Sequence, residues 1–232
     1  MIPSRRLIPF FVILLGIVPI LAITDPLDAV EEVEFLDGIG EAPEESEGPY
    51  VINTSAYWNS GPDLVVSVAA DGNVRPEAQD LARDFISGNL PAGNITSRWN
   101  ELLMSFPDGR TPTLALASEQ DANIKVVLTE EEHPEGKMGK TRIYAVKGIR
   151  HILSAEVTIY SATHALDQGT LEHVLAHELG HALGLSHSTN PESIMFSLIE
   201  LQNGSVINHI GSCEERGISL LYVESRIGST DC

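Results

Sequence analysis

One short histidine-rich stretch constrains this chain more than any other feature. It is the string HELGH from His177 to His181, followed by Gly184 and His187. On a helix, residues four apart lie on the same face, so His177 and His181 can point their imidazoles at one ion while Glu178 sits beside it. Glycine tolerates a positive φ where a helix ends, so a turn at Gly184 can bring His187 to the same ion. Three imidazoles leave a fourth position for water, the open arrangement of catalytic zinc.

The residues around this stretch resemble the metzincin clan of zinc peptidases. The resemblance is strong over residues 174–196 and fainter over residues 50–223, and the string HELGHALGLSHS is most similar to the matrixins. In the segment that follows, Met195 resembles the methionine of the clan's Met-turn. The resemblance implies that Met195 forms a hydrophobic floor beneath the metal ligands, and an ordinary core methionine is the alternative.

The residues after Met195 depart from the family pattern. Ser197 occupies the place that holds a tyrosine ligand in some branches of the clan, which argues against those branches. Matrixins usually have Tyr-Pro where this chain has Phe196 and Ser197, so the wall of the specificity pocket differs. A zinc peptidase of another metzincin branch is therefore kept as an alternative.

The predicted fold class is α+β and metzincin-like. We expect a mixed, mostly parallel twisted sheet with an antiparallel edge strand, a packing helix, an active-site helix and a small helical C-terminal subdomain after the Met-turn. The alternation and β-branched runs predict strands at residues 63–70, 113–118, 124–129, 141–147 and 152–160. Helices are expected to open at Pro76, after Thr96 and after a cap at Thr170, with a last helix over residues 214–223. The resemblance implies that a substrate peptide pairs with the edge strand, for which residues 141–147 are the candidate.

The site residues predict an exported zinc-dependent endopeptidase. Zinc held by His177, His181 and His187 would lower the pKa of a bound water towards about 7. Glu178 can accept that water's proton and later pass it to the leaving amine, so it serves first as base and then as acid. The alternative is a non-catalytic zinc-containing protein that binds peptides on the same fold, and the intact Glu178 argues against it.

Composition narrows the choice of partners. The chain has 33 acidic and 14 basic residues and a formal net charge of −19. Such a surface repels nucleic acid and anionic membranes, so the expected partner is a protein or peptide substrate and no nucleic acid is expected. We expect a monomer. The three glutamates at residues 130–132 make Ca2+ a second candidate cofactor beside Zn2+, with a solvated loop as the alternative.

The N-terminal residues are expected to direct export. Residues 1–24 begin with two arginines, continue with an apolar run at 7–23 and end in polar residues. The run is long for a cleaved signal and slightly short for a membrane span. Both a signal peptide and a signal anchor at 1–24 are therefore kept. In either case the catalytic part is secreted or extracellular.

An acidic linker is predicted at residues 25–48, followed by a matrixin-like catalytic domain at 49–232. Residues 29–48 include eight acids and no lysine or arginine, so the linker should stay solvated. A short inhibitory segment whose carboxylate caps the zinc is the alternative. A cysteine switch, familiar in matrixins, is excluded in this chain because no cysteine precedes the metal motif.

The two cysteines, Cys213 and Cys232, both follow the zinc motif. In an exported protein an isolated pair is most simply one disulfide, and two unpaired thiols are the alternative.

Overall fold

The structure is a computed structural model of the 232-residue chain. The residues that it describes are 29–38, 49–59, 63–87, 95–107, 109–118, 121–160, 167–197, 201–202, 205–206 and 210–232. The predicted signal or anchor at residues 1–24 lies outside them. Within the described part, no helix has the length and apolar character needed to cross a membrane.

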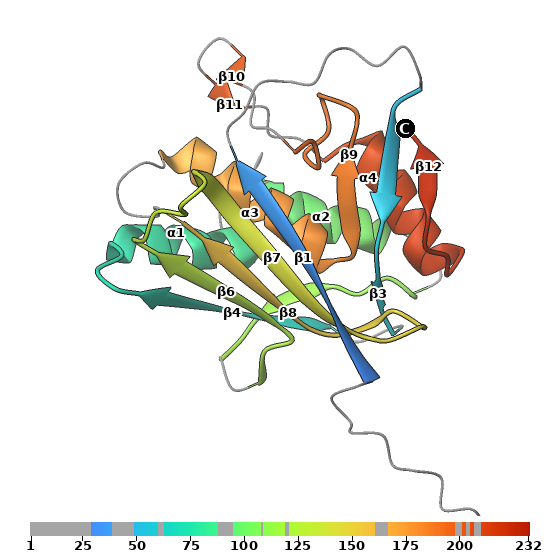
Figure 1. The fold of residues 1–232 in the computed structure, drawn as a ribbon, viewed down its shortest axis with the longest axis horizontal. Coiled ribbons are helices and arrows are strands. Elements are labelled where there is room, and N and C mark those ends of the chain that lie inside the picture. Colours follow the sequence, from blue (N-terminus) through green and yellow to red (C-terminus); the bar gives the residue numbers. More distant parts are fainter. Residues whose placement is uncertain are drawn as a thin grey trace, which may run out of the picture.

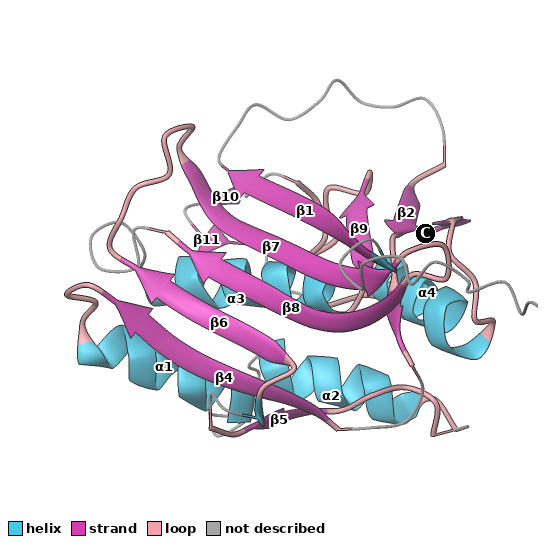
Figure 2. Ribbon diagram, turned by 60° about the horizontal axis from the view of Figure 1, so that its bottom comes forward, coloured by secondary structure: helices cyan, strands magenta, loops and turns pink. Residues whose placement is uncertain are grey.

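A seven-stranded sheet organises the fold (Figures 1 and 2). Its strand order is β1-β7-β8-β6-β4-β5, and β3 pairs with β8 outside this path. The strands are β1 (Val30–Gly38), β3 (Tyr57–Trp58), β4 (Leu64–Asp71), β5 (Leu114–Leu116), β6 (Ile124–Thr129), β7 (Lys137–Val146) and β8 (His151–Ile159). From β5 through β8 all pairs along the order are parallel, whereas β7 is antiparallel to β8 and β1 is antiparallel to β7. The predicted mixed, mostly parallel sheet is confirmed.

Three helices pack against one face of this sheet (Figure 2). They are α1 (Pro76–Ser87), α2 (Ile95–Ser105) and α3 (Gln168–Ala182). Helix α1 opens at Pro76 as expected and buries Ala78, Ala82, Phe85 and Ile86, which recur at helical spacing along one face. Helix α3 is buried on all sides from Thr170 to Ala182, apart from Glu172. Because the helix is enclosed, its polar side chains lie in the protein interior and need partners there.

The chain after α3, joined by one strand from the N-terminal part of the chain, forms the predicted C-terminal subdomain. Its small sheet joins β12 (Ser229–Asp231), β2 (Val51–Thr54) and β9 (Leu185–Ser188) in that order, and β10 (Leu201–Gln202) pairs with β11 (Ser205–Val206). Helix α4 (Ser212–Ile218) continues into the π-helical η3 (Ser219–Val223), in place of the last helix expected at residues 214–223. A disulfide joins Cys213 to Cys232, as predicted.

Strand β1 is the main departure from the sequence-based expectation. It forms from residues expected to remain in the solvated linker, so that prediction is wrong for residues 30–38. The strand pairs with β7 from Val30 opposite Val146 to Asp37 opposite Gly139. Its acidic side chains meet basic ones on β7, which a reading of local charge cannot detect. β7, the candidate edge, is therefore an interior strand of the described sheet, and β1 is the edge.

Helix α3 is capped by Asp167 rather than by Thr170. Asp167 Oδ1 accepts a hydrogen bond from the Thr170 amide at 3.0 Å, and Oδ2 accepts one from the Thr170 hydroxyl at 3.1 Å. The Thr170 amide bond, followed by the Thr170 hydroxyl bond, holds the pKa of Asp167 below its ordinary value because both favour the ionised carboxylate. The predicted cap residue is thus the partner of the actual cap.

We expect Asp167→Ala to lower the free energy of unfolding by about 1 kcal/mol, because it removes the N-cap of α3. Asp167→Asn retains an acceptor oxygen and should keep most of that stability. A carboxylate with a lowered pKa stabilises the fold above its unfolded pKa and loses this effect as pH falls through its folded pKa. The gap between wild type and Asp167→Ala should therefore close in acid. Urea unfolding with zinc present measures both effects, and equal midpoints at neutral pH would contradict the cap.

Candidate metal centre

The structure brings the three predicted histidines together. His177 and His181 lie one turn apart on α3, and His187 lies on β9. One ligand nitrogen from each lies within 4.8 Å of the other two. His177 and His181 are buried and His187 is half-buried. In the part of the chain that the structure describes, this is the one group of three or more His, Cys, Asp or Glu side chains placed to share an ion. The calcium candidate at residues 130–132 forms no such group.

Backbone carbonyls orient two of the imidazoles. His177 Nδ1 donates to the carbonyl of Ile194, and His181 Nδ1 donates to that of Leu185 at 2.8 Å. A carbonyl oxygen can only accept, so the Nδ1 atom carries the proton of each neutral ring and Nε2 presents its lone pair. The two Nε2 atoms are 3.0 Å apart. Two lone pairs at this separation repel unless a cation or a proton lies between them, so the arrangement fits a shared metal ion.

Gly184 makes the turn that brings His187 into the site, as predicted. Its φ is +100°, which favours glycine, and a Cβ placed there would lie 1.9 Å from the carbonyl oxygen of Ala56. The Gly184 amide donates to the carbonyl of His181 at 2.8 Å and so closes the end of α3. The chain then enters β9, which supplies both the Leu185 carbonyl and His187.

Met195 packs against α3 beside the ligands. It is fully buried, and a Cβ at Gly180 would lie 2.2 Å from its sulfur, so the glycine is what allows the close approach. The Met195 carbonyl accepts a hydrogen bond from the Ser188 amide at 2.8 Å, which ties this turn to β9. The turn around Met195 therefore orients His177 through the Ile194 carbonyl. It also packs against Gly180, the residue before His181.

The side chain of Glu178 extends from α3 towards β7. Its side chain is fully buried, and a Cβ at Gly139 would lie 1.9 Å from Oε1. The Thr141 hydroxyl contacts both the Glu178 carboxylate and, at 3.1 Å, the Glu178 carbonyl. Gly139 and Thr141 thus make room for the carboxylate and orient it. Sequence reasoning missed both, because their role depends on the packing of β7 over α3.

Phe35 of β1 also reaches the metal centre. Its ring stacks on the imidazole of His181, with centroids 4.2 Å apart and planes 7° apart. It meets His187 edge-on at 6.4 Å. The alternation of Val33 and Phe35 with glutamates is the signal that could have revealed a strand here.

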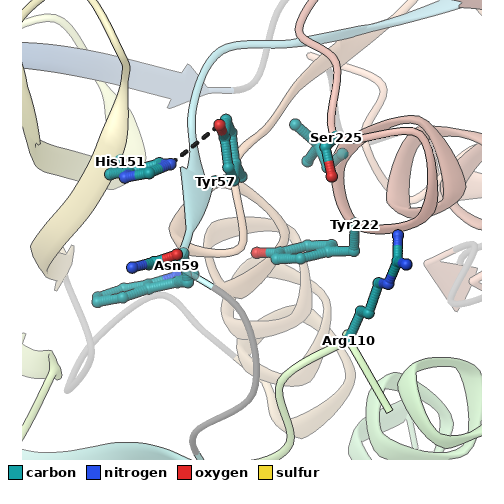
Figure 3. A pocket seen from close by; sticks show the side chains of 8 residues that line it. Tyr57, Asn59, Arg110, His151, Tyr222 and Ser225 are labelled. Carbon is teal, nitrogen blue, oxygen red and sulfur yellow. Dashed lines mark hydrogen bonds between the residues drawn. The ribbon is translucent and has the colours of Figure 1, made fainter. Parts of the chain in front are cut away.

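Of the remaining described histidines, His133 and His151 lie apart from this centre. His151 Nε2 lies 2.9 Å from the hydroxyl of Tyr57, and both residues line a cavity (Figure 3). That cavity has a volume of about 300 Å3 and is lined by Tyr57, Trp58, Asn59, Arg110, His151, Leu221, Tyr222 and Ser225. His133 packs edge-on against Tyr160. His173 is buried on α3, and its ring lies nearly parallel to that of His177 with centroids 6.5 Å apart.

Comparisons with known proteins agree with this geometry. The matrixin family model matches residues 108–223, which contain all three histidines, Glu178 and Met195. Stromelysin-1 of Equus caballus is 45% identical over 155 residues, which is 62% of this chain and 30% of that protein. Stromelysin-1 of Rattus norvegicus is 29% identical over 145 residues, with 58% and 30% covered. A probable matrix metalloproteinase 095L of Invertebrate iridescent virus 3 is 37% identical over 90 residues, with 34% and 24% covered.

The chain therefore spans 30% of the length of the two stromelysins. Among solved structures, the crystal structure of myroilysin covers 72% of this chain and 86% of its own, with a TM-score of 0.42 and 12% identity. The family match extends over half of the chain and takes in the whole metal centre. The chain belongs to the matrixin family.

Proposed function

We propose that this chain is a zinc-dependent endopeptidase that acts outside the cytosol. The observation that carries the proposal is the convergence of three imidazoles beside a buried carboxylate, in a chain of the matrixin family. The disulfide between Cys213 and Cys232 supports an oxidising compartment. Export through residues 1–24, either as a cleaved signal or as an anchor at 7–23, stays a prediction, as does the monomeric state.

The residues fit zinc as the resident ion. The Nε2 atoms of His177 and His181 and one nitrogen of His187 would hold it, and three neutral imidazoles are a common catalytic ligand set. When bound, zinc supplies a Lewis acid that lowers the pKa of water and polarises a carbonyl. The carbonyls of Ile194 and Leu185 keep the first two rings in the tautomer that such binding needs.

Glu178 carries the proton chemistry. As water attacks the peptide carbonyl, a new C–O bond forms and Glu178 accepts the proton from the O–H bond that breaks. When the C–N bond breaks, Glu178 passes this proton to the leaving nitrogen. Thr141 is a positioning residue because its hydroxyl holds the carboxylate in one place throughout. A protein that only binds peptides would not need a carboxylate positioned beside the metal.

We expect Glu178→Gln to reduce peptide cleavage by a factor of about 10² to 10⁴ while zinc binding stays intact, because general acid–base catalysis contributes this much. Glu172→Gln is the matched control, since Glu172 lies on α3 but bonds to Gln168 at 2.8 Å. Mass spectrometry of a mixed peptide library reads the products, and elemental analysis reads the zinc. A library left uncut by the wild type with its zinc site filled would favour the peptide-binding alternative.

Loss of one ligand should appear directly in the metal content. We expect His187→Ala to lower zinc affinity by more than about 100-fold, because removing a ligand costs more than removing a partner that orients one. His151→Ala is the control, since His151 bonds to Tyr57 and lies outside the centre. Equilibrium dialysis measures both, and equal affinities for the two variants would remove His187 from the site.

The role of Thr141 predicts a split between kcat and KM. We expect Thr141→Val to lower kcat by a factor of roughly 10 to 100 with little change in KM, because a hydrogen bond to a charged group is lost while the side chain keeps its shape. Thr141→Ser retains the hydroxyl and should recover most of the rate. Steady-state kinetics on one peptide test this. If Thr141→Val and Thr141→Ser behave alike, the hydroxyl does not position Glu178.

A further inference from the structure

Strand β1 occupies the edge of β7 along which an extended peptide would have to pair. A peptide that adds a strand to a sheet needs the unpaired amides and carbonyls of the edge. Residues 30–37 of β1 pair one to one with residues 146–139 of β7, which leaves no part of this edge available while β1 is docked. Figures 1 and 2 show β1 lying along β7 over its length.

The docked strand also covers the metal centre. Phe35 lies opposite Thr141, whose hydroxyl contacts the Glu178 carboxylate, and Asp37 lies opposite Gly139, which leaves room for that carboxylate. On the same face, the ring of Phe35 stacks on His181. A peptide bond delivered to Glu178 and to the histidines would have to pass through the space that Phe35 fills.

Charge holds the other face of β1. Glu34 lies 2.6 Å from Lys140 Nζ and 3.2 Å from Arg142, and Glu32 lies 2.6 Å from Arg142. Glu31 alternates onto the face of Val33 and Phe35, and there it adds a pair with Arg150 at 3.5 Å. The hydrogen bond from Lys140 keeps the pKa of Glu34 below its ordinary value. In a chain with a formal net charge of −19, three bases gathered opposite one acidic strand select that strand.

We propose that Val30–Gly38 is a built-in competitor of substrate, which holds the peptide-binding edge of β7 and covers the metal histidines until a substrate displaces it. The proposal rests on the proposed peptidase function. Among the described contacts, the ring of Phe35 is what brings this strand onto the histidines.

The contacts make this competitor displaceable. The ion pairs are partly exposed, with side-chain exposures of 18% for Lys140, 31% for Arg142 and 36% for Glu34, so solvent and salt weaken them. An edge strand held in this way lowers the fraction of molecules that can accept substrate. It raises the apparent KM by the inverse of that fraction and leaves kcat unchanged at saturation.

The test compares the full-length, zinc-loaded wild type with Glu34→Lys, Phe35→Ala and Glu101→Lys. Glu101→Lys is the matched control, because Glu101 is an exposed acid on α2 and undergoes the same change of charge. Kinetics use one uncharged fluorogenic peptide. Hydrogen exchange of β7, followed by mass spectrometry, reports docking of β1 without any need for activity.

We expect KM to fall about tenfold in Glu34→Lys and in Phe35→Ala, with kcat unchanged, while exchange at residues 139–145 becomes faster. Glu101→Lys should match the wild type in both measurements. Unchanged KM and exchange in the two β1 variants would overturn the competitor role while the peptidase function stands. Absence of cleavage by all four proteins, each with zinc bound, would overturn the peptidase function and the competitor role with it.

Discussion

The metal centre depends on two hydrogen bonds from imidazole to backbone. The carbonyls of Ile194 and Leu185 each accept a proton from Nδ1 of a histidine on α3, and thereby aim the Nε2 atoms of His177 and His181 at one point. Both carbonyls come from chain beyond the helix, after the turn at Gly184. If that turn opened, His177 and His181 would lose the carbonyls that orient them. His187 would move away from the site with β9. The helix presents the ligands, and the segment after it makes them a site.

Close packing around α3 makes this orientation rigid. Gly180 admits Met195 on one side of the helix, and Gly139 admits the carboxylate of Glu178 on the side of β7. Indole nitrogens also fix the helix, because Trp58 donates to the carbonyl of Ala182 at 2.9 Å and Trp99 to that of Ala176 at 3.0 Å. Buried polar groups that are paired in this way confine a helix more closely than apolar contact alone. The proposed hydrolytic chemistry needs that confinement, since in it Glu178 must meet both water and the leaving nitrogen.

The sequence predicted the parts of this site whose geometry is local. The spacing of His177 and His181 fixes their common face, and Gly184 marks the turn, so the three histidines that come together and the neighbouring carboxylate could be named from the sequence. β6 begins and ends where expected because most of its β-branched residues are buried. Strand β1 and the role of Thr141 could not be read in this way, because each depends on a partner distant in the chain. From the sequence alone Glu34 is predicted to be a solvated acid, because its partners Lys140 and Arg142 are more than 100 residues away in the chain.

Strand β1 shows why its acidity and its position belong together. Alternation along the strand divides two tasks between its faces, with Val33 and Phe35 against the core and Glu32 and Glu34 against the bases of β7. An apolar strand on this edge would be held by burial alone and would resist displacement. An acidic strand without Lys140 and Arg142 opposite would not dock, because the net charge of the chain opposes it. The combination gives an edge that is closed in the resting molecule and still exchangeable, because most of the charge contacts that close it remain in reach of water.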